Sequence, residues 1–223
     1  MEMETLGHDW RLQWPFRLLV AGSSGSGKTT LVKRLVSESK DVMSRPPASV
    51  VLFYSHMQPA YEELRRAAPC PVALVPGGPV GTLRTKPGTL VIVDDLQASH
   101  GEEMSAWFTR KSHHNDTSVI YLVQNVFDKT PHHRTISLNA THIVLFKNPR
   151  DSSQVQHLDK QVFPGCGGFL TRAYEMSTAA TPHSYIVMDF NQSTPGNFRL
   201  RNTLFPIQDF PDAYAYVMEE AEG

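Results

Sequence analysis

The sequence predicts an α/β fold in which helices cover a mainly parallel sheet. Short β-rich runs alternate along the chain with segments whose apolar residues recur at helical spacing, and this alternation is typical of parallel α/β domains. A glycine-rich segment separates the first β-rich run from the first helical one. The composition agrees, because 223 residues with 40% apolar and 19% charged side chains are typical of a globular domain.

Five β-rich runs are predicted to form the main strands of this sheet. They are residues 17–21, 49–54, 90–94, 119–123 and 142–146. The glycine- and proline-rich segment 76–88 is predicted to be a surface loop that leads into the third of these strands, because such residues favour turns.

Three helices are predicted between or after these strands. The first begins near Lys28 and carries an apolar stripe of Leu31, Val32, Leu35 and Val36. The second carries Met104, Trp107 and Phe108 and starts at a capping box formed by Ser99 and Glu102. The third lies within 149–163, has a cap at Asp151 and Ser152, and has Val155, Leu158 and Val162 at helical spacing.

The pattern changes after about residue 164. Residues 185–190 and 198–205 are predicted to form a hairpin across a turn-prone segment, and residues 212–220 a short acidic helix. No internal repeat is visible. We therefore expect a single domain over 1–223, with a core of about 16–163 and an extension, the hairpin and the short helix, over 164–223.

Charge and composition exclude several classes of protein. The chain has 21 basic and 22 acidic residues, a net charge of −1, so it is not a polybasic tail protein. Its purely apolar runs are far shorter than the roughly 20 residues that cross a bilayer, and its first residues do not resemble an export signal. Cys70 and Cys166 match neither a disulfide framework nor a zinc spacing, so we expect a reducing, intracellular setting.

The glycine-rich segment predicts a phosphate-binding loop. Residues 22–29, GSSGSGKT, fit the pattern G-x-x-x-x-G-K-[ST] between a predicted strand and a predicted helix. Glycines allow successive N–H groups to face the phosphates, and the helix N-terminus adds its positive dipole. We expect Lys28 to reach the β- and γ-phosphates and the Thr29 hydroxyl to bind Mg²⁺. The expected nucleotide-binding residues are Gly22, Ser23, Ser24, Gly25, Ser26, Gly27, Lys28, Thr29 and Thr30.

Two acidic residues end the apolar strand at 90–94. Asp94 is predicted to hold Mg²⁺ beside the loop, and Asp95 to orient or deprotonate the attacking water. The next strand, at 119–123, ends in Gln124 and Asn125. An amide there can lie next to the γ-phosphate, and Gln124 is the preferred candidate, although amides also end strands for purely structural reasons.

These motifs resemble a known family. The loop, VIVDD, YLVQN and the segment 134–151, RTISLNATHIVLFKNPRD, are similar to the viral DNA-packaging ATPases of the poxvirus and adeno-like type in the FtsK/HerA P-loop superfamily, over about residues 16–163. The resemblance implies a RecA/FtsK-like fold and an ATP- and Mg²⁺-dependent motor. It also implies a homo-oligomeric ring that moves double-stranded DNA into a capsid, with capsid protein as a further partner.

The same resemblance bears on location and on the site residues. It implies a protein of the virus-infected cell, nuclear or cytoplasmic, that can accompany the virion and needs no membrane. The superfamily commonly ends its acidic strand in Asp-Glu, and this chain departs from that pattern at Asp95. Rings of this kind use an arginine from the neighbouring subunit. The resemblance favours Arg110, with Arg134 and Arg150 as runners-up, while a solvated surface role is the alternative for each of them.

Other side chains have weaker signals. Because the chain is nearly neutral, any affinity for DNA must come from local patches, for which the candidates are Lys111, Lys129, Arg134, Arg84 and Lys86. The histidine pairs 113–114 and 132–133 have no zinc-like spacing. Trp10, Trp14 and Phe16 can flank an adenine, although packing in the core is the preferred interpretation.

Three other functions compete with the motor. A P-loop kinase of a small acceptor shares the loop, but it has little use for a polar strand end and normally closes an arginine-rich lid, which is not visible. A GTPase should carry Asn-Lys-x-Asp, and residues 147–151, KNPRD, do not fit. A nucleotide-gated, non-catalytic scaffold that binds capsid protein or DNA remains open.

Overall fold

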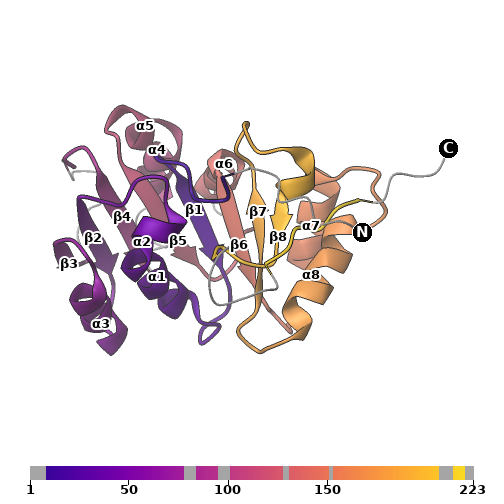
Figure 1. Cartoon of the computed structure of the whole chain (residues 1–223), viewed down its shortest axis with the longest axis horizontal. Coiled ribbons are helices and arrows are strands. Elements are labelled where there is room, and N and C mark those ends of the chain that lie inside the picture. The colour runs from indigo at the N-terminus through magenta and orange to yellow at the C-terminus, as the bar shows by residue number, and fades with distance from the viewer. Residues whose placement is uncertain are drawn as a thin grey trace.

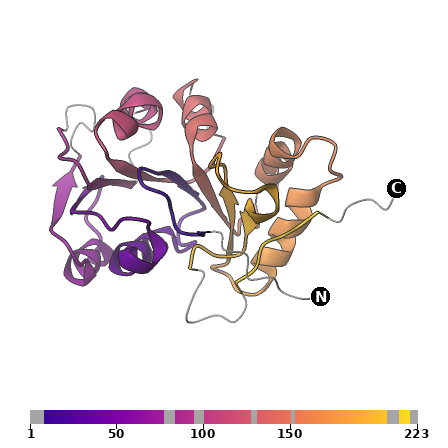
Figure 2. The same ribbon diagram turned by 45° about the horizontal axis from the view of Figure 1, so that its top comes forward.

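One sheet of eight strands organises the computed structural model, which describes residues 9–77, 84–94, 101–127, 131–150, 153–205 and 213–218. The strand order is β3-β2-β4-β5-β1-β6-β7-β8, and helices cover both faces of the sheet (Figures 1 and 2). The fold is therefore the mainly parallel α/β fold that the sequence predicts. No helix in the described ranges has the length and apolarity needed to cross a membrane.

The first six strands in this order are parallel to one another. Their bounds are β3 Val72–Pro76, β2 Ser49–Tyr54, β4 Thr89–Asp94, β5 Ser118–Val123, β1 Arg17–Ala21 and β6 His142–Phe146. The five predicted strands are confirmed to within one residue at each end, and β3 is an addition. Every residue of β4, β5 and β6 is buried, as expected for parallel strands that are covered on both faces.

Two apolar layers lie on opposite faces of the sheet. On one face, Leu18 and Val20 of β1 pack with α1 (Lys28–Ser37), α2 (Ser39–Val42) and α3 (Pro59–Ala67). On the other face, Leu19 and Ala21 pack with α4 (Gly101–Ala106), the π-helical segment η2 (Trp107–Lys111), α6 (Pro131–Asn139), α7 (Ser153–Val162) and α8 (Phe169–Ala179). The short helix α5 (Ser112–His114) follows η2.

The predicted helical stripes are buried as expected. All four apolar residues of the α1 stripe are buried, and Met104, Trp107 and Phe108 are fully enclosed. Of the third helix, Val155 and Leu158 are buried and Val162 is half-buried. The expected caps at Ser99 and at 151–152 lie outside the described residues, as do residues 78–83 of the expected loop 76–88.

The C-terminal part extends the main sheet. The predicted hairpin is confirmed, but its second strand is much shorter than the expected 198–205. β7 (Tyr185–Asp189) pairs antiparallel with β6 and with the two-residue β8 (Leu200–Arg201), and the 3₁₀ turn η3 (Gly196–Phe198) lies between β7 and β8. The acidic helix expected at 212–220 is wrong for 213–218, where Ala215 forms an antiparallel bridge to Arg201. An edge strand such as β8 has backbone groups that no further strand of the sheet can pair. Here the Tyr216 N–H donates to the Leu200 carbonyl at 2.9 Å, so the C-terminal segment pairs with this edge.

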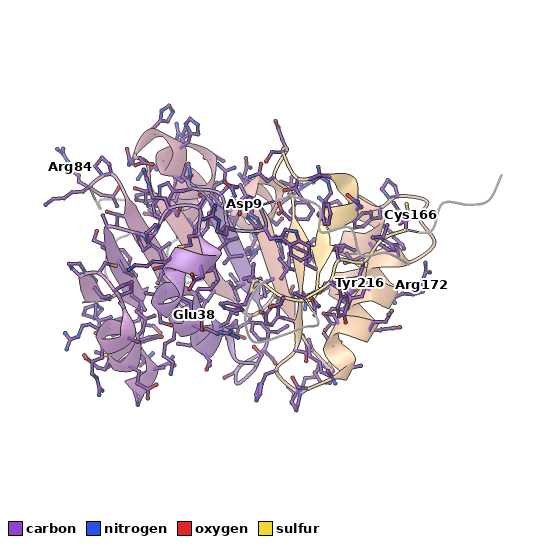
Figure 3. All side chains as sticks on the ribbon, viewed as in Figure 1. Asp9, Glu38, Arg84, Cys166, Arg172 and Tyr216 are labelled. Atoms are coloured by element: carbon purple, nitrogen blue, oxygen red, sulfur yellow. The ribbon has the colours of Figure 1, made fainter. Side chains whose placement is uncertain are left out.

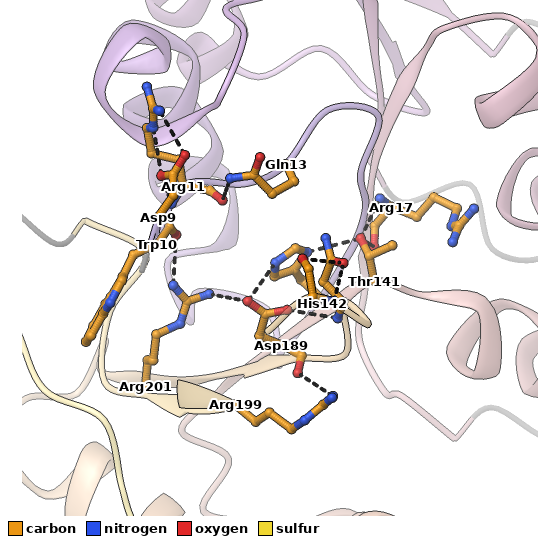
Figure 4. Close-up of polar contacts among 12 residues, drawn as sticks. Asp9, Trp10, Arg11, Gln13, Arg17, Thr141, His142, Asp189, Arg199 and Arg201 are labelled. Atoms are coloured by element: carbon orange, nitrogen blue, oxygen red, sulfur yellow. Dashed lines mark hydrogen bonds and ion pairs between the residues drawn. The ribbon is translucent and has the colours of Figure 1, made fainter. Parts of the chain in front are cut away.

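A buried ionic cluster ties β6, β7 and β8 to the N-terminal segment (Figure 4). One Asp189 carboxylate oxygen lies 3.0 Å from Arg201 Nη2 and 3.3 Å from His142 Nε2, and all three side chains are buried. Arg201 Nη1 donates to the Trp10 carbonyl at 2.8 Å. Burial alone raises the pKa of Asp189, but the hydrogen bond from His142 and the charges of His142 and Arg201 outweigh it and lower the pKa to about 2.

Replacing Asp189 should therefore destabilise the fold strongly. We expect Asp189→Asn to lower the free energy of unfolding by about 3–5 kcal/mol, because Arg201 is then left as a buried charge without its carboxylate. Folding lowers the pKa of Asp189 from 3.8 to about 2. The contribution of the ionised Asp189 to the free energy of unfolding is therefore fully present above pH 3.8 and is lost as the pH falls through 2. Denaturant unfolding of both proteins from pH 7 to pH 2 measures this.

The matched control is Asp9→Asn. Asp9 pairs with Arg11 at 2.8 Å, but both side chains are 42% exposed. The decrease in the free energy of unfolding should therefore stay under about 1 kcal/mol. Equal losses for the two variants at pH 7 would contradict the assigned role of the buried cluster.

Candidate functional site

The loop between β1 and α1 is curled as a phosphate-binding loop requires. Gly27 precedes α1 with a φ of +108°, a conformation that L side chains rarely adopt. A Cβ on Gly22 would lie 2.6 Å from Ser26 Oγ and 2.8 Å from Phe146 Cβ. The glycines therefore permit both the turn into the helix and the close approach of the loop to β6.

Lys28 lies in the concave side of this loop. Its Nζ donates to the Gly22 carbonyl at 2.5 Å and to the Ser23 carbonyl at 3.0 Å. Ser26 Oγ is buried and makes no hydrogen bond to any part of the chain that the structure describes. A cation, a hydroxyl and the helix N-terminus thus converge in one small space, and this arrangement suits an anion with several oxygens.

Asp94 stands at the end of β4 beside this loop. One of its carboxylate oxygens, Oδ2, accepts hydrogen bonds from Thr29 Oγ1 at 3.2 Å and from the Tyr61 hydroxyl at 2.9 Å. Asp94 is buried and Thr29 half-buried. A buried carboxylate next to a hydroxyl is an oxygen ligand pair of the kind that Mg²⁺ prefers. The residues that the sequence assigns to Mg²⁺ therefore lie together and fit that ion.

Tyr61 is a site residue that the sequence analysis missed. It lies on α3, is 1% exposed, and its ring centroid is 5.3 Å from that of Tyr54. Its contact with Asp94 joins residues 33 positions apart. Neither the α3 sequence nor its spacing from the loop signals this contact.

The two amide side chains that follow β5, Gln124 and Asn125, have different surroundings. Gln124 is exposed and lines the same cavity as the loop and Asp94. Asn125 Oδ1 instead accepts a hydrogen bond from the Phe127 N–H at 2.7 Å, which fixes the turn after the strand. Gln124 is therefore the amide that is available to a ligand. Asp95, the expected base, lies outside the described residues.

These groups share a cavity of about 710 Å³, a size typical of small-molecule sites. The loop, Asp94 and Gln124 line it. It is also lined by Arg34 of α1, by Phe146 of β6, and by His183, Tyr185 and Phe205 of the C-terminal part of the chain.

The C-terminal wall of the cavity was not predicted. His183 Nδ1 lies 3.1 Å from the Ser26 carbonyl of the loop, and the Arg34 guanidinium lies 3.9 Å from the centroid of the Phe205 ring. Trp14 and Phe16, considered as adenine neighbours, lie elsewhere: the Trp14 indole donates to Asp116 at 3.0 Å and Phe16 is fully buried in the core. Trp14 and Phe16 therefore pack in and against the core, which is the interpretation that the sequence favoured.

None of the three arginine candidates lines this cavity. Arg110 is exposed on η2, Arg134 is exposed on α6, and Arg150 is exposed in the turn after β6. Arg134 borders a separate hollow of about 320 Å³ with Val126 and Phe127. The structure thus leaves all three exposed at the surface and outside the lining of this cavity.

The histidines do not form a metal cluster in the described ranges, where no group of three or more His, Cys, Asp or Glu side chains could hold an ion. His113 and His114 are exposed on α5. His133 is buried on α6, with Nδ1 3.2 Å from the Val126 carbonyl. Lys129, a candidate DNA contact, lies outside the described residues.

A solved structure shares this fold: the genome packaging NTPase B204 from Sulfolobus turreted icosahedral virus 2, determined in complex with ATP-gammaS. It has a TM-score of 0.53 and 14% identity, over 81% of this chain and 95% of that one. The ATPase DotB of Legionella pneumophila matches with a TM-score of 0.36 and 13% identity, over 60% of this chain and 42% of that one. At 14% identity the likeness to B204 shows the fold alone, a mainly parallel α/β sheet covered by helices.

Sequence comparison adds no closer relative. No protein-family model matches the chain, and no curated protein matches it.

The contact between Tyr61 and Asp94 yields a test of the metal site. Tyr61→Phe removes the donor that holds Asp94 Oδ2 and keeps the ring. We expect the Mg²⁺ concentration needed for half-maximal binding of a fluorescent ATP analogue to rise roughly tenfold, a typical loss when a partner of a metal ligand is removed. A Mg²⁺ titration of analogue fluorescence measures this.

Tyr54→Phe is the matched control. Tyr54 is a buried neighbour of Tyr61, so this change removes a phenol hydroxyl from the same aromatic pair and leaves the bond to Asp94 in place. A similar shift in both variants would show that packing, and not the hydrogen bond to Asp94, sets the Mg²⁺ dependence.

Proposed function

We propose that the chain is an ATP-hydrolysing motor that works in a homo-oligomeric ring and translocates double-stranded DNA, packaging a viral genome into a capsid. The observation that carries this proposal is the convergence of Lys28, the Thr29–Asp94 pair and Gln124 on one cavity. The motifs that resemble packaging ATPases support it, and so does the fold shared with B204, itself a genome packaging NTPase.

In this proposal the loop binds the phosphates of ATP. Loop N–H groups and Lys28 contact the β- and γ-phosphates, and Ser26 Oγ supplies a further donor. Thr29 and Asp94 hold Mg²⁺, which neutralises charge on the phosphate oxygens when it is bound. The remaining loop residues from Gly22 to Thr30 shape the backbone around the phosphates.

Hydrolysis requires an oriented water. Asp95 takes a proton from the water as its oxygen attacks the γ-phosphorus, and the bond from that phosphorus to the bridging oxygen breaks to give ADP and phosphate. Gln124 lies where it can contact the γ-phosphate or the water, so it can signal hydrolysis to the rest of the subunit. An arginine from the neighbouring subunit stabilises the developing charge.

The order of the strands favours this motor over a kinase. β5 lies between β1, which leads into the loop, and β4, which ends in Asp94. The polar end of β5 therefore faces the cavity from between β1 and β4, and this sensor position has little use in transfer of a phosphoryl group to a small acceptor.

A GTPase is disfavoured separately. Asn148 is unsuited to reading guanine, because its Oδ1 accepts from the Arg150 N–H at 3.1 Å.

The proposal also includes a further partner and a cellular location. Capsid protein is a further partner, and the infected host cell, in nucleus or cytoplasm, is the place of action, with the virion as a second. Neither requires a membrane. The non-catalytic scaffold and the kinase are the alternatives that the next experiment separates from the motor.

ATPase assays with and without duplex DNA test the function. We expect phosphate release without any small acceptor, stimulated by duplex DNA. Lys28→Ala should lower the rate at least about 100-fold, because a positioned cation facing the transferred phosphate is removed. Activity of Lys28→Ala within about twofold of the unmodified protein would exclude this site, and release that depends on an acceptor would indicate a kinase.

Mixing variants tests the trans arginine. We expect Arg110→Ala to bind ATP normally and hydrolyse it slowly. In mixed rings with Lys28→Ala, some interfaces join an intact loop to an intact Arg110, so ATPase activity should exceed that of either variant alone at equal total protein. Sizing must confirm mixed assemblies. If they show no gain, the trans role moves to Arg134 or Arg150, which the same mixing can test.

A further inference from the structure

A second charged feature lies at the opposite edge of the sheet from the cavity. Arg84 and Lys86 precede β4, and Lys111, His113 and His114 precede β5. We call these five residues the basic ridge. We propose that the basic ridge binds the phosphate backbone of duplex DNA, which names the contact surface for the DNA partner and so rests on the proposed function.

The two segments of the ridge are held side by side. Thr85 Oγ1 and Thr117 Oγ1 are 2.9 Å apart, and the Gly88 N–H donates to the Asp116 carbonyl at 2.9 Å. The Thr89 hydroxyl also donates to the Lys86 carbonyl at 2.7 Å. The backbone that presents Arg84 and Lys86 is therefore braced against the segment that presents the histidines.

Charge is concentrated here although the chain as a whole is nearly neutral. The ridge contributes three Lys or Arg and two His, and the single acidic residue within 84–90 and 111–118 is Asp116. Its two carboxylate oxygens lie 2.7 and 2.6 Å from Arg45 Nη2, and the Trp14 indole adds a third hydrogen bond. Because Asp116 is already neutralised, it does not cancel the positive charge of the ridge.

The ridge side chains are accessible. Arg84, Lys86, His113 and His114 are exposed, and Lys111 is half-buried with its ammonium 5.6 Å from the centroid of the Trp107 ring. Figure 3 shows Arg84 pointing outward at one end of the molecule, with Arg172 at the other end. Long cations on a braced, exposed edge suit a repeating polyanion, since phosphate contacts supply most sequence-independent affinity for DNA.

The ridge is joined to the nucleotide cavity by two strands. The segment with Lys86 continues into β4, which ends at Asp94, and the segment with His114 continues into β5, which is followed by Gln124. Six-residue strands span about 17 Å. Duplex DNA on the ridge therefore contacts the starts of the same two strands whose ends carry the metal ligand and the sensor amide.

Binding of labelled duplex DNA, followed by fluorescence anisotropy at several salt concentrations, tests the ridge. We expect Arg84→Ala with Lys86→Ala to weaken binding roughly tenfold at low salt, and to lower the salt slope by about one for each DNA phosphate that the variant no longer neutralises. ATPase activity without DNA should be unchanged while its stimulation by DNA falls. Lys111→Ala should act in the same direction.

The control is Lys160→Ala with Arg172→Ala, which removes the same two charges from exposed sites on α7 and α8. Equally weakened binding in ridge and control variants, or unchanged binding in the ridge variant, would overturn the ridge and leave the motor standing. Absence of DNA binding by the unmodified protein would overturn both. Thermal unfolding of each variant shows whether the fold is kept.

Discussion

The hydrogen bond from the Gly22 N–H to the Val123 carbonyl, 3.1 Å long, continues the ladder between β1 and β5 into the phosphate loop. In that ladder Ala21 pairs with Val123, and in the next one Asp94 pairs with Leu122. Parallel strands in this register end at one level, so the loop, Gln124 and Asp94 meet without any long side chain having to reach across the sheet. Lys28 then closes the loop on itself through the Gly22 carbonyl. The geometry of the site is thus a consequence of backbone pairing.

The direction of β7 explains why the C-terminal part belongs to the same site. Because β7 runs antiparallel to β6, Tyr185 pairs with Phe146 at the cavity edge and Asp189 pairs with His142 at the opposite edge. β7 therefore supplies a wall of the cavity at its start. At its end it supplies the buried Asp189 carboxylate, which accepts from Arg201, and Arg201 in turn donates to the Trp10 carbonyl. Loss of the ionic cluster would loosen the strand that also positions His183 and Tyr185.

Sequence patterns predicted what depends on local periodicity. The apolar strands, the α1 stripe and the glycine loop each follow from neighbouring residues, and the structure places them as expected. The contact from Tyr61 to Asp94 and the wall of His183, Tyr185 and Phe205 depend on tertiary pairing between segments far apart in the chain, which no local pattern reports. The prediction of a helix in the acidic C-terminal segment was wrong for the same reason. The backbone groups of Tyr214 and Tyr216 form hydrogen bonds with the β8 edge and not within a helix.

The distribution of cations in the cavity gives a physical reason for a ring in the proposed function. Among its described lining residues, the lysine and arginine are Lys28 and Arg34. Arg34 is six positions after Lys28, about 9 Å further along α1, and it is engaged with Glu38 at 2.8 Å and with the Phe205 ring. These contacts hold Arg34 away from Lys28. In the proposed function, a further cation beside Lys28 and Mg²⁺ would therefore come from outside this described lining, and an exposed arginine of a neighbouring subunit would supply it.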